Sequence, residues 1–474
     1  MLLVLVGIFW TTVEVLGIWT AIRAVRDTRT SQGAIAWALF LVTTPLLGVP
    51  LYWVFGRSKF NGYVEAMRAA REDYMAMTEG VDRMPSLPCP TDREDSDQAR
   101  CVFEQIATIP YMGGNELELL VDGSPTFGAI FDAIEQAEQY VLVQFFIVHD
   151  DGLGGRMKEL LCRKAREGVL VRFLYDEVGC HATPREYWDE LRRAGVRVHP
   201  FLTTRGRGNR FQLNFRNHRK IVVVDGHTAF VGGHNVGDEY IGMQPSIGRW
   251  RDTHLRCSGP AVLGVELSYA KDWYWATGKV LHLTWEPPEK RGDAEVLAVG
   301  TSPADDWESC SLMFVRAINA AQKRIWIASP YFVPDSAVSK ALQLAALRGV
   351  DVRLLIPRKP DHKIVWLAGF AALKELHMDN IRVYRYRDGF LHQKVFLCDD
   401  WLAGVGTANL DNRSFRLNFE ITMLVEDKSF CADVESMFRK DFENCVETGP
   451  AEYDRTHTAF KVLVKVARLL SPIL

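Results

Sequence analysis

The sequence predicts an α/β protein that consists of two tandem α/β/α sandwich repeats with pseudo-twofold symmetry, preceded by an N-terminal transmembrane helical hairpin. Two observations predict this architecture. A short motif of histidine, lysine and aspartate occurs twice, each time within the same succession of helix and strand patterns. Two long apolar stretches lie within the first 60 residues. With 474 residues, 48% of them hydrophobic, the chain has material for several domains.

The motif H-x-K-x4-D stands at residues 217–225, NHRKIVVVD, and again at 391–399, LHQKVFLCD. The apolar and β-branched residues after each lysine are typical of a buried strand. Side chains two positions apart on an extended segment point the same way, so each histidine is expected beside its lysine. The motif residues are His218, Lys220 and Asp225 in the first copy and His392, Lys394 and Asp399 in the second.

Each motif is followed by small residues and an asparagine, Asn235 in GGHN and Asn409 in GTAN. An imidazole, an ammonium group and an amide together suit a phosphate. The cation and the amide hold its oxygens, and the imidazole attacks phosphorus or moves a proton. A single histidine on a strand is usually a satisfied core residue, but repetition of the whole set favours a site that holds both a nucleophile and an acid.

The repeat extends beyond the motifs. In each half a helix pattern runs into a buried strand, a second helix and strand follow, and a further strand precedes the motif. Two such units related by a pseudo-twofold axis bring the two histidine strands together at one site between the halves. The matched segments are 131–148 with 315–333, the stretch ending at Asp176 with that ending at Pro357, and the strands beginning at Gly195 and Asn380.

The N-terminal hairpin is predicted from apolar stretches at 2–22 and 34–55, each long enough for the roughly 20 residues of a spanning helix. A cleaved signal peptide is disfavoured because the first stretch lacks a basic start and a clear cleavage site. A buried core helix is disfavoured by the length and uniform apolarity of the second, in which Pro45 and Pro50 indicate a kink or a partly re-entrant course. Basic residues flank both sides, so the positive-inside rule leaves the orientation open.

The expected organisation is an anchor over 1–60, a polar linker over 61–100, a first half over 101–290, a second half over 291–455 and an amphipathic helix over 456–474. The basic and apolar faces of that last segment are typical of a helix in a membrane interface, or of a packed terminal helix. A net charge of −3 offers no general attraction for nucleic acid. Nine dispersed cysteines without a C-x-x-C pair disfavour zinc and fit reduced thiols better than a disulfide framework.

The paired motifs resemble those of the phospholipase D superfamily, and the whole chain resembles the bacterial cardiolipin synthase family. The resemblance implies two phospholipase D-like repeats and a membrane-bound phosphatidyltransferase that needs neither metal nor cofactor. Such an enzyme would transfer a phosphatidyl group from one phosphatidylglycerol to another and release glycerol. The segments that carry the narrower resemblance are AIAWALFLVTTPLLGVPLYWVFGRSKF, RNHRKIVVVDG, GGHNVGDEY, WRDTHLRCSGPAV and ANLDNRSFRLNFE.

The resemblance also implies roles for single residues. His218 would attack phosphorus to give a phosphohistidine, and His392 would protonate the departing alcohol and then deprotonate the incoming one, with the reverse assignment left open. Each imidazole needs a carboxylate to orient it. The residues expected to hold the phosphate are Lys220, Lys394, Asn235 and Asn409.

The supporting residues follow from the same resemblance. The expected orienting carboxylates are Glu420 in the second half and Asp252 in the first. Thr407 offers a hydroxyl where the first copy has only a glycine, and Asp225 and Asp399 are expected to support the motifs from outside the phosphate site.

The expected partners are phosphatidylglycerol, anionic membrane lipids and the bilayer, with no nucleic acid. The expected location is the inner membrane, multi-pass, with the catalytic domain facing the cytoplasm. Alternatives are a phospholipase D-type hydrolase that releases phosphatidic acid, a nuclease, and a non-catalytic scaffold. Arginines near the first motif suit a second phosphate, an anionic surface or a solvated loop: Arg205, Arg207, Arg210, Arg216 and Arg219.

Overall fold

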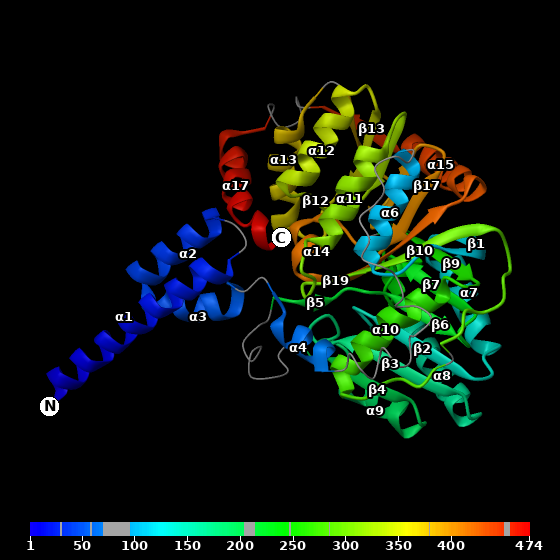
Figure 1. Ribbon diagram of the computed structural model, residues 1–474, viewed down its shortest axis with the longest axis horizontal. Helices are drawn as coiled ribbons and strands as arrows, with labels where there is room; N and C mark the ends of the chain where they lie inside the picture. Colours follow the sequence, from blue (N-terminus) through cyan, green and yellow to red (C-terminus); the bar gives the residue numbers. More distant parts are fainter. Residues whose placement is uncertain are drawn as a thin grey trace.

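The computed structural model describes residues 1–28, 31–56, 59–69, 95–202, 214–245, 248–283, 285–378, 380–449 and 456–474. Within these ranges the body is built on one continuous sheet of 16 strands, with helices on both faces (Figure 1). The two central strands, β1 (Met112–Val121) and β10 (Ala294–Thr301), pair antiparallel and join the two halves. The predicted fold class of two tandem α/β repeats is confirmed.

Each half contributes the same succession of strands outward from the centre. In the first half β1 is followed across the sheet by β9 (Thr253–Ser258), β7 (Thr228–Gly232), β6 (Ile221–Val224), β2 (Tyr140–Phe145), β3 (Leu170–Asp176) and β4 (Arg197–Phe201). In the second half β10 is followed by β19 (Asn418–Glu426), β17 (Leu402–Gly406), β16 (Val395–Cys398), β11 (Arg324–Ala328), β13 (Asp351–Pro357), β14 (Ile381–Tyr386) and β20 (Cys445–Thr448).

The strand that follows each lysine is buried on both faces, which explains its continuous apolar sequence. On β6, Val222 and Val224 belong to one apolar cluster, and Ile221 and Val223 belong to the cluster on the opposite face. The helices of the first half are α7 (Gly123–Glu135), α8 (Gly152–Arg166) and α9 (Arg185–Arg193) on one face and α10 (Val262–Thr277) on the other. The second half uses α11 (Ser309–Ala320), α12 (Ser336–Leu347), α13 (Lys363–Leu376), α14 (Asn412–Arg416) and α15 (Lys428–Glu443).

The N-terminal apolar region forms three helices that project from the body (Figure 1). Among the described residues, α1 (Leu2–Asp27) is the one helix long and apolar enough to cross a membrane. The second predicted span is divided into α2 (Ser31–Thr43) and α3 (Pro45–Phe55), so the chain bends within it, as the prolines predicted. The break falls at Pro45, because proline lacks the N–H that would continue α2 but is well suited to the first turn of α3.

The small residues of α1 explain how α2 and α3 fold back on it. Ala21 and Ala24 are buried against Leu41, Val49 and Tyr52 in one apolar cluster. Close approach of small residues of this kind is how helices associate without a large apolar side chain between them. The region is therefore a hairpin whose second arm is itself bent.

The segment predicted as a polar linker, residues 61–100, contains helical structure at both ends. α4 (Asn61–Ala69) packs Tyr63, together with Phe60, against aromatic rings of both halves, Phe215, Trp275 and Phe419. α6 (Asp95–Ala107) packs on α11 and β10. Residues 70–94 lie outside the described residues.

One cysteine departs from the expectation of reduced thiols. Cys101 on α6 is disulfide-bonded, and its partner lies outside the described residues. The expectation is therefore wrong for this cysteine. The other described cysteines are free: Cys162, Cys180, Cys257, Cys310, Cys398, Cys431 and Cys445.

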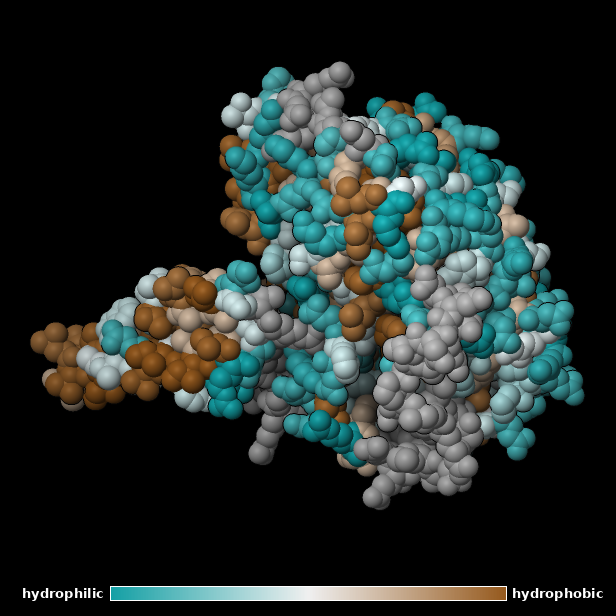
Figure 2. Space-filling model, turned by 45° about the horizontal axis from the view of Figure 1, so that its top comes forward, coloured by the Kyte–Doolittle hydropathy of each residue, from teal (hydrophilic) through white to brown (hydrophobic). Residues whose placement is uncertain are grey.

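The C-terminal helix α17 (Thr458–Leu469) packs on α13 and also keeps an apolar surface of its own. Val464 and Ala467 are buried, Val464 against Phe370 and Ala371 of α13. Large apolar side chains on the rest of α17 and just beyond it are exposed to solvent: Val462, Leu463, Val466, Leu469 and Leu470. Figure 2 shows apolar residues gathered along this helix and on the N-terminal helices, on the same side of the molecule.

Candidate active site

The short strand that precedes each histidine of the repeated motif pairs with a strand of the other half. β5 (Arg216–Asn217) pairs parallel with the start of β19, and His218 donates its backbone N–H to Phe419 at 2.9 Å. β15 (Phe390–Leu391) pairs parallel with β8 (Trp250–Arg251), and His392 donates its backbone N–H to Arg251 at 2.8 Å. The two motifs therefore meet at the interface of the halves, where the pseudo-twofold symmetry predicted them.

The pairing of β5 with β19 determines which carboxylate lies beside His218. Glu420 directly follows Phe419, and its two carboxylate oxygens lie 2.9 and 3.0 Å from Nδ1 of His218. Thr407 and Ser414 donate hydroxyl hydrogen bonds of 2.6 and 2.8 Å to the same carboxylate, and the Asn418 amide donates one of 3.1 Å. Glu420 is fully buried and has several donors around it, so it fixes one orientation of the His218 ring.

The partner of His392 is set in the same way. Asp252 follows Arg251 on β8, and its Oδ2 lies 2.7 Å from Nδ1 of His392. Thr253 donates its backbone N–H to Oδ1 of Asp252 at 2.8 Å. The two carboxylates expected from the sequence are thus beside the histidines, but each orients the histidine of the opposite half.

Burial makes both imidazoles weak bases in this structure. Burial is the largest cause that lowers the pKa of His218 to about 4; Glu420 opposes the shift, and Lys220 adds to it. Burial, followed by Lys394, Lys220 and His218, holds the pKa of His392 well below its ordinary value. Burial alone would raise the pKa of Glu420, but His218 and Lys220 outweigh it and lower that pKa. A neutral His218 beside a charged Glu420 keeps its proton on Nδ1 and presents a free lone pair on Nε2.

The two lysines lie next to their histidines, as the two-residue spacing predicts. Nζ of Lys220 donates to the backbone carbonyl of His218 at 2.6 Å and lies 5.3 Å from the centre of the Phe146 ring. Nζ of Lys394 lies 2.9 Å from Nδ1 of His392 and also donates to the carbonyl of that residue. Burial is the main cause that lowers the pKa of Lys394 to about 8 and that of Lys220 well below its ordinary value.

The two asparagines are buried near the motifs in different settings. Both polar atoms of the Asn235 amide have a partner: Oδ1 accepts from the N–H of Ile147 at 3.1 Å, and Nδ2 donates one hydrogen bond to the Tyr240 hydroxyl at 2.9 Å. Oδ1 of Asn409 is buried and has no hydrogen-bond partner among the described residues. An amide oxygen accepts hydrogen bonds, so only the amide N–H groups of either asparagine could bind a phosphate oxygen.

The aspartates of the motif lie at the far end of the strand from the histidines. The Asp225 carboxylate accepts three backbone N–H groups, from residues 138, 139 and 140, at 2.7–2.8 Å. Asp399 accepts those of residues 322, 323 and 324 at 2.8–2.9 Å. Both aspartates have positive φ, 50° and 52°, where the chain turns out of the strand. Each aspartate thus fastens the loop before the neighbouring strand and is not brought to the phosphate site.

Gly233 and Thr407 occupy equivalent places and explain why the two copies differ. Thr407 donates its hydroxyl to Glu420. At Gly233 a Cβ atom would overlap the Asp252 carboxylate, so only glycine leaves room for that side chain. The first copy therefore has glycine in place of the threonine because the Asp252 carboxylate lies against this position.

Two buried aspartates were missed by the sequence reasoning. Asp272 on α10 accepts hydrogen bonds from both residues that flank His218 and from Gln144. Asp441 on α15 accepts a hydrogen bond from Gln393, the residue after His392. It also forms an ion pair with Arg251 at 2.7 Å. Each aspartate anchors the backbone on which a histidine stands.

A sequence signal for these aspartates exists in the repeat itself. The tripeptides KDW at 271–273 and KDF at 440–442 stand at equivalent points of the two halves, on the helices that follow β9 and β19. A comparison of the halves beyond the histidine motifs would have aligned them.

Of the arginines near the first motif, Arg205, Arg207 and Arg210 lie outside the described residues. Arg219 is buried and turned away from the phosphate site, with Nη1 bonded to Asp272 at 2.8 Å and Nε to the Glu420 carbonyl at 3.0 Å. It stabilises the histidine segment from behind and is not part of a second phosphate site.

Comparison with known proteins places this geometry in a family. A family model described as "Cardiolipin synthase, PLD-like domain" matches residues 130–244 and 314–442, and one described as "Phospholipase_D-nuclease N-terminal" matches residues 15–57. Cardiolipin synthase A of Pseudomonas putida (strain W619) is 49% identical over 466 residues, which cover 98% of this chain and 97% of that protein. The chain belongs to the cardiolipin synthase family.

Two further comparisons agree with this assignment. Cardiolipin synthase A of Pseudomonas aeruginosa (strain LESB58) is 48% identical over 477 residues, covering 99% of this chain and 96% of that one. The crystal structure of phosphatidylserine synthase from Haemophilus influenzae Rd KW20 superposes with a TM-score of 0.64, covers 80% of this chain and 100% of that one, and is 15% identical. The second likeness shows the fold alone.

Membership of the cardiolipin synthase family confirms the predicted enzyme class, a phosphatidyltransferase of the phospholipase D superfamily. The match of residues 15–57 covers the region of α1, α2 and α3, in which α1 is long and apolar enough to cross a membrane. The roles of single residues in this cardiolipin synthase homologue rest on the site geometry.

Proposed function

We propose that this protein makes cardiolipin by transferring the phosphatidyl group of one phosphatidylglycerol to a hydroxyl of a second, with release of glycerol. The observation that carries the proposal is the pair of histidines, each backed by its own buried carboxylate and lysine, within a chain that matches cardiolipin synthases over nearly its whole length. Two imidazoles at one site suit a double displacement, in which one is bonded to phosphorus and the other moves the protons.

His218 is the nucleophile in this proposal. Its Nδ1 has one kind of partner, the Glu420 carboxylate, so the hydrogen stays on Nδ1 and Nε2 is free to attack phosphorus. Nδ1 of His392 lies near both the Asp252 carboxylate and the Lys394 ammonium group. The carboxylate favours a hydrogen on Nδ1 and the ammonium group favours a lone pair there. His392 is therefore the ring better suited to change its protonation during the reaction.

The reaction then balances in two steps. In the first, Nε2 of His218 forms a bond to phosphorus, the bond from phosphorus to the glycerol oxygen breaks, and His392 gives that oxygen a proton. In the second, His392 takes the proton of the acceptor hydroxyl, whose oxygen bonds to phosphorus as the histidine bond breaks. The lipid phosphate is an anion, and its charge offsets Lys220 and Lys394, which raises the proton affinity of His392 when substrate is bound. Asn409 and the two ammonium groups hold the phosphate oxygens.

The proposed enzyme is held on the bilayer at both ends of the chain. α1 to α3 form the anchor, and the exposed apolar side chains of α17 lie on the same side of the molecule (Figure 2). α17 packs on α13, whose first turn follows His362, a residue that contributes to the electrostatic environment of His392. An interfacial α17 would therefore keep the reacting centre next to the lipids.

We place the catalytic body on the cytoplasmic side of a multi-pass anchor. The seven free cysteines among the described residues support this side, because thiols stay reduced in the cytosol, while the disulfide of Cys101 counts against it. Reactivity of an introduced surface cysteine towards a membrane-impermeant maleimide, applied to intact spheroplasts and to inverted vesicles, decides the side. Labelling in spheroplasts alone would overturn the cytoplasmic placement.

The test of the function gives the purified protein phosphatidylglycerol as its only lipid, in detergent with a chelator, and measures lipid products and free glycerol. Cardiolipin and glycerol in equal amounts, both absent with His218→Ala and with His392→Ala, are expected. Phosphatidic acid as the sole product would show that water is the acceptor and that the protein is a hydrolase of the same superfamily.

A further inference from the structure

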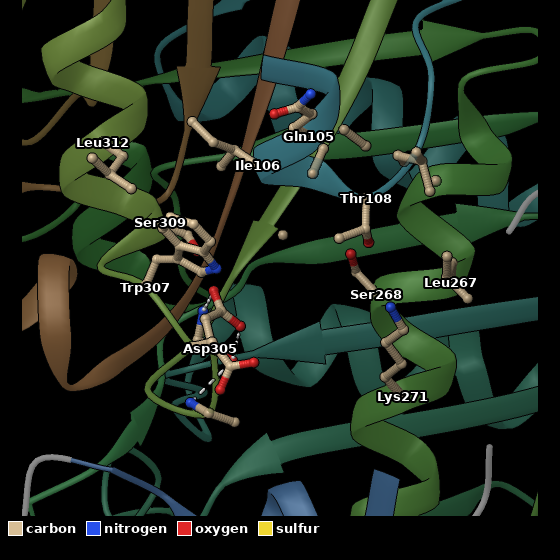
Figure 3. A pocket seen from close by; sticks show the side chains of 18 of the residues that line it. Gln105, Ile106, Thr108, Leu267, Ser268, Lys271, Asp305, Trp307, Ser309 and Leu312 are labelled. Atoms are coloured by element: carbon tan, nitrogen blue, oxygen red, sulfur yellow. Dashed lines mark hydrogen bonds between the residues drawn. The ribbon is translucent and has the colours of Figure 1, made fainter. Parts of the chain in front are cut away.

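A large cavity lies behind the histidine site, on the other side of the sheet from the helices α7 to α9. Its volume is about 920 Å³, within the range of pockets that enclose small-molecule ligands. It has α10 on one side, α11 on the other, and α6 and α4 at its ends (Figure 3). No histidine or lysine of the repeated motif lines its described wall, so the cavity is distinct from the phosphate site.

Small residues line the floor of the cavity: Ala298 and Gly300 of β10 and Gly264 of α10. A Cβ atom at Gly264 would lie 2.8 Å from Ile109 and 3.0 Å from Ala298, so the helix here approaches the sheet as closely as it can. A Cβ atom at Gly300 would lie 2.6 Å from Oγ of Ser268, so α10 packs closely on β10 and the open space lies between α10 and α11.

The wall mixes apolar and polar side chains. Figure 3 shows Ile106 beside Gln105, Leu267 beside Ser268, and Lys271 and Asp305 at the end of the cavity away from Gln105. A ligand that fits this arrangement has a long apolar portion and a polar head.

The rim carries apolar side chains in contact with solvent. Trp307 is 70% exposed and Leu312 is 40% exposed, and both line the cavity. Large apolar side chains rarely stand exposed beside an apolar hollow in a protein that meets only water. Tryptophan is also the residue that best suits a boundary between water and hydrocarbon.

A second feature of the rim is strain. Thr108 lines the cavity with φ of 61°, a backbone conformation that is unfavourable for a β-branched residue. Thr108 directly follows the last residue of α6, and its backbone conformation sets the direction in which the chain leaves the cavity. Strain of this kind persists where the surrounding structure has a use for the geometry.

The end of the cavity formed by α4 connects it to the proposed membrane anchor. α4 supplies Tyr63, Val64 and Met67 to the lining and follows α3 after a few residues, with Lys59 bound to Asp306 at 2.7 Å. The anchor and the cavity are thus adjacent along the chain. Bilayer phospholipid is the long, apolar, polar-headed molecule available to a protein held in this way.

We infer that this cavity is a phospholipid site separate from the phosphate site, in which an acyl chain lies between α10 and α11 and the head group lies at the end formed by Lys271 and Asp305. The lipid in it is bound and not transformed. Its floor reaches Arg219, which holds the backbone of Glu420, so an occupied cavity stabilises the strand that orients His218. The inference does not depend on which lipid the histidines use.

Photolabelling tests the site in the full chain. The protein is placed in vesicles of phosphatidylglycerol and phosphatidylethanolamine that contain a trace of phosphatidylethanolamine with a diazirine at the end of one acyl chain. After irradiation the labelled peptides are mapped by mass spectrometry. Label on α6 and α11, in addition to the N-terminal helices, is expected. Label confined to α1, α2, α3 and α17 would overturn the inference.

A pair of variants separates the cavity from general contact with lipid. Leu312→Asp puts a charge on the apolar wall at an exposed position, and Leu344→Asp makes the same change on α12, where the side chain is 50% exposed and lines no part of the cavity. Leu312→Asp should reduce the label on α6 and α11 at least about fivefold, and Leu344→Asp should leave it unchanged. Equal labelling in the two variants would contradict the proposed site.

Discussion

The two histidines are chemically similar in sequence but differ in the groups around Nδ1. His218 faces Glu420 alone, whereas His392 faces both Asp252 and Lys394. The difference arises because Nζ of Lys220 lies on a backbone carbonyl and Nζ of Lys394 lies on the ring as well. The assignment of nucleophile and proton carrier therefore depends on one lysine contact.

The charge of Lys394 predicts how the reaction depends on pH. Its pKa of about 8 means that the ammonium group is present below that pH and is lost above it. If the charge holds the lipid phosphate, kcat/KM should fall as pH rises above about 8. Lys394→Arg should move this fall to higher pH, because a guanidinium group stays charged. Profiles of cardiolipin formation from pH 6 to about 10 check this.

Lys340→Arg is the matched control for that profile, because Lys340 is exposed on α12 and far along the chain from the motif. Its profile should coincide with that of the unchanged protein. A fall near pH 8 that Lys394→Arg leaves in place would assign the titrating group elsewhere.

Gly233 gives a second prediction at this scale. Gly233→Ala should displace Asp252 and lower turnover by about 100-fold, the order of effect expected when a catalytic group moves by about 1 Å. Gly155→Ala on α8, where a Cβ meets no atom within 4 Å, is the control and should keep full activity. Turnover is measured as cardiolipin formed per folded protein. Normal activity of Gly233→Ala would mean that Asp252 does not need its present position.

At the scale of elements, the motif aspartates act on the turn that leads into a strand. Asp225→Asn weakens three backbone hydrogen bonds to a carboxylate, and we expect a loss of about 1–3 kcal/mol in the free energy of unfolding. Turnover of the protein that remains folded should change less than about threefold, because Asp225 does not reach the phosphate site. Urea unfolding in detergent and an activity assay measure the two effects. Loss of activity in a fully folded variant would place Asp225 among the residues that the reaction needs.

Much of this element structure was predictable, and particular residues show where prediction stopped. The apolar run after Lys220 predicted β6, and the spacing of histidine and lysine predicted their common direction. The crossing of Glu420 to His218 was not predictable from one half, because it depends on the parallel pairing of β5 with β19 across the interface. The bend at Pro45 was indicated by the proline itself, but its sharpness depends on how α2 and α3 pack against α1.

The structure of the segment predicted as a linker, residues 61–100, depends on distant residues. The polar composition of residues 61–100 predicted a surface segment, yet α4 is fixed by one tyrosine. Tyr63 packs among Phe215, Trp275 and Phe419 and donates its hydroxyl to Asp272 at 3.1 Å. The partners come from three distant parts of the chain, so no local pattern announces them.

At the scale of the whole molecule, the proposed function has both ends of the chain meet the bilayer. Replacement of Val462, Leu463 and Val466 by serine removes the exposed apolar face of α17. Full burial of each such side chain in an apolar phase is favourable by about 1.5–3 kcal/mol. Without these side chains α17 should leave the bilayer surface, and turnover on vesicles should slow at least about tenfold. The hairpin keeps the variant membrane-bound, and activity on phosphatidylglycerol in detergent micelles should be unchanged.

Leu347→Ser on α12, where the side chain is 72% exposed, is the control for this triple variant and should behave as the unchanged protein on both substrates. An α17 variant that keeps full activity on vesicles would show that this helix only packs on α13.

The central claim is that His218 attacks phosphorus while His392 carries the proton. Phosphatidyl-p-nitrophenol tests it, because nitrophenolate leaves without a proton. With this donor, His392→Ala should release one nitrophenolate per site in a burst and accumulate a phosphatidyl group on His218, since no base activates the acceptor. His218→Ala should give no burst. A burst from His218→Ala, with the adduct on His392, would contradict the account and reverse the two roles.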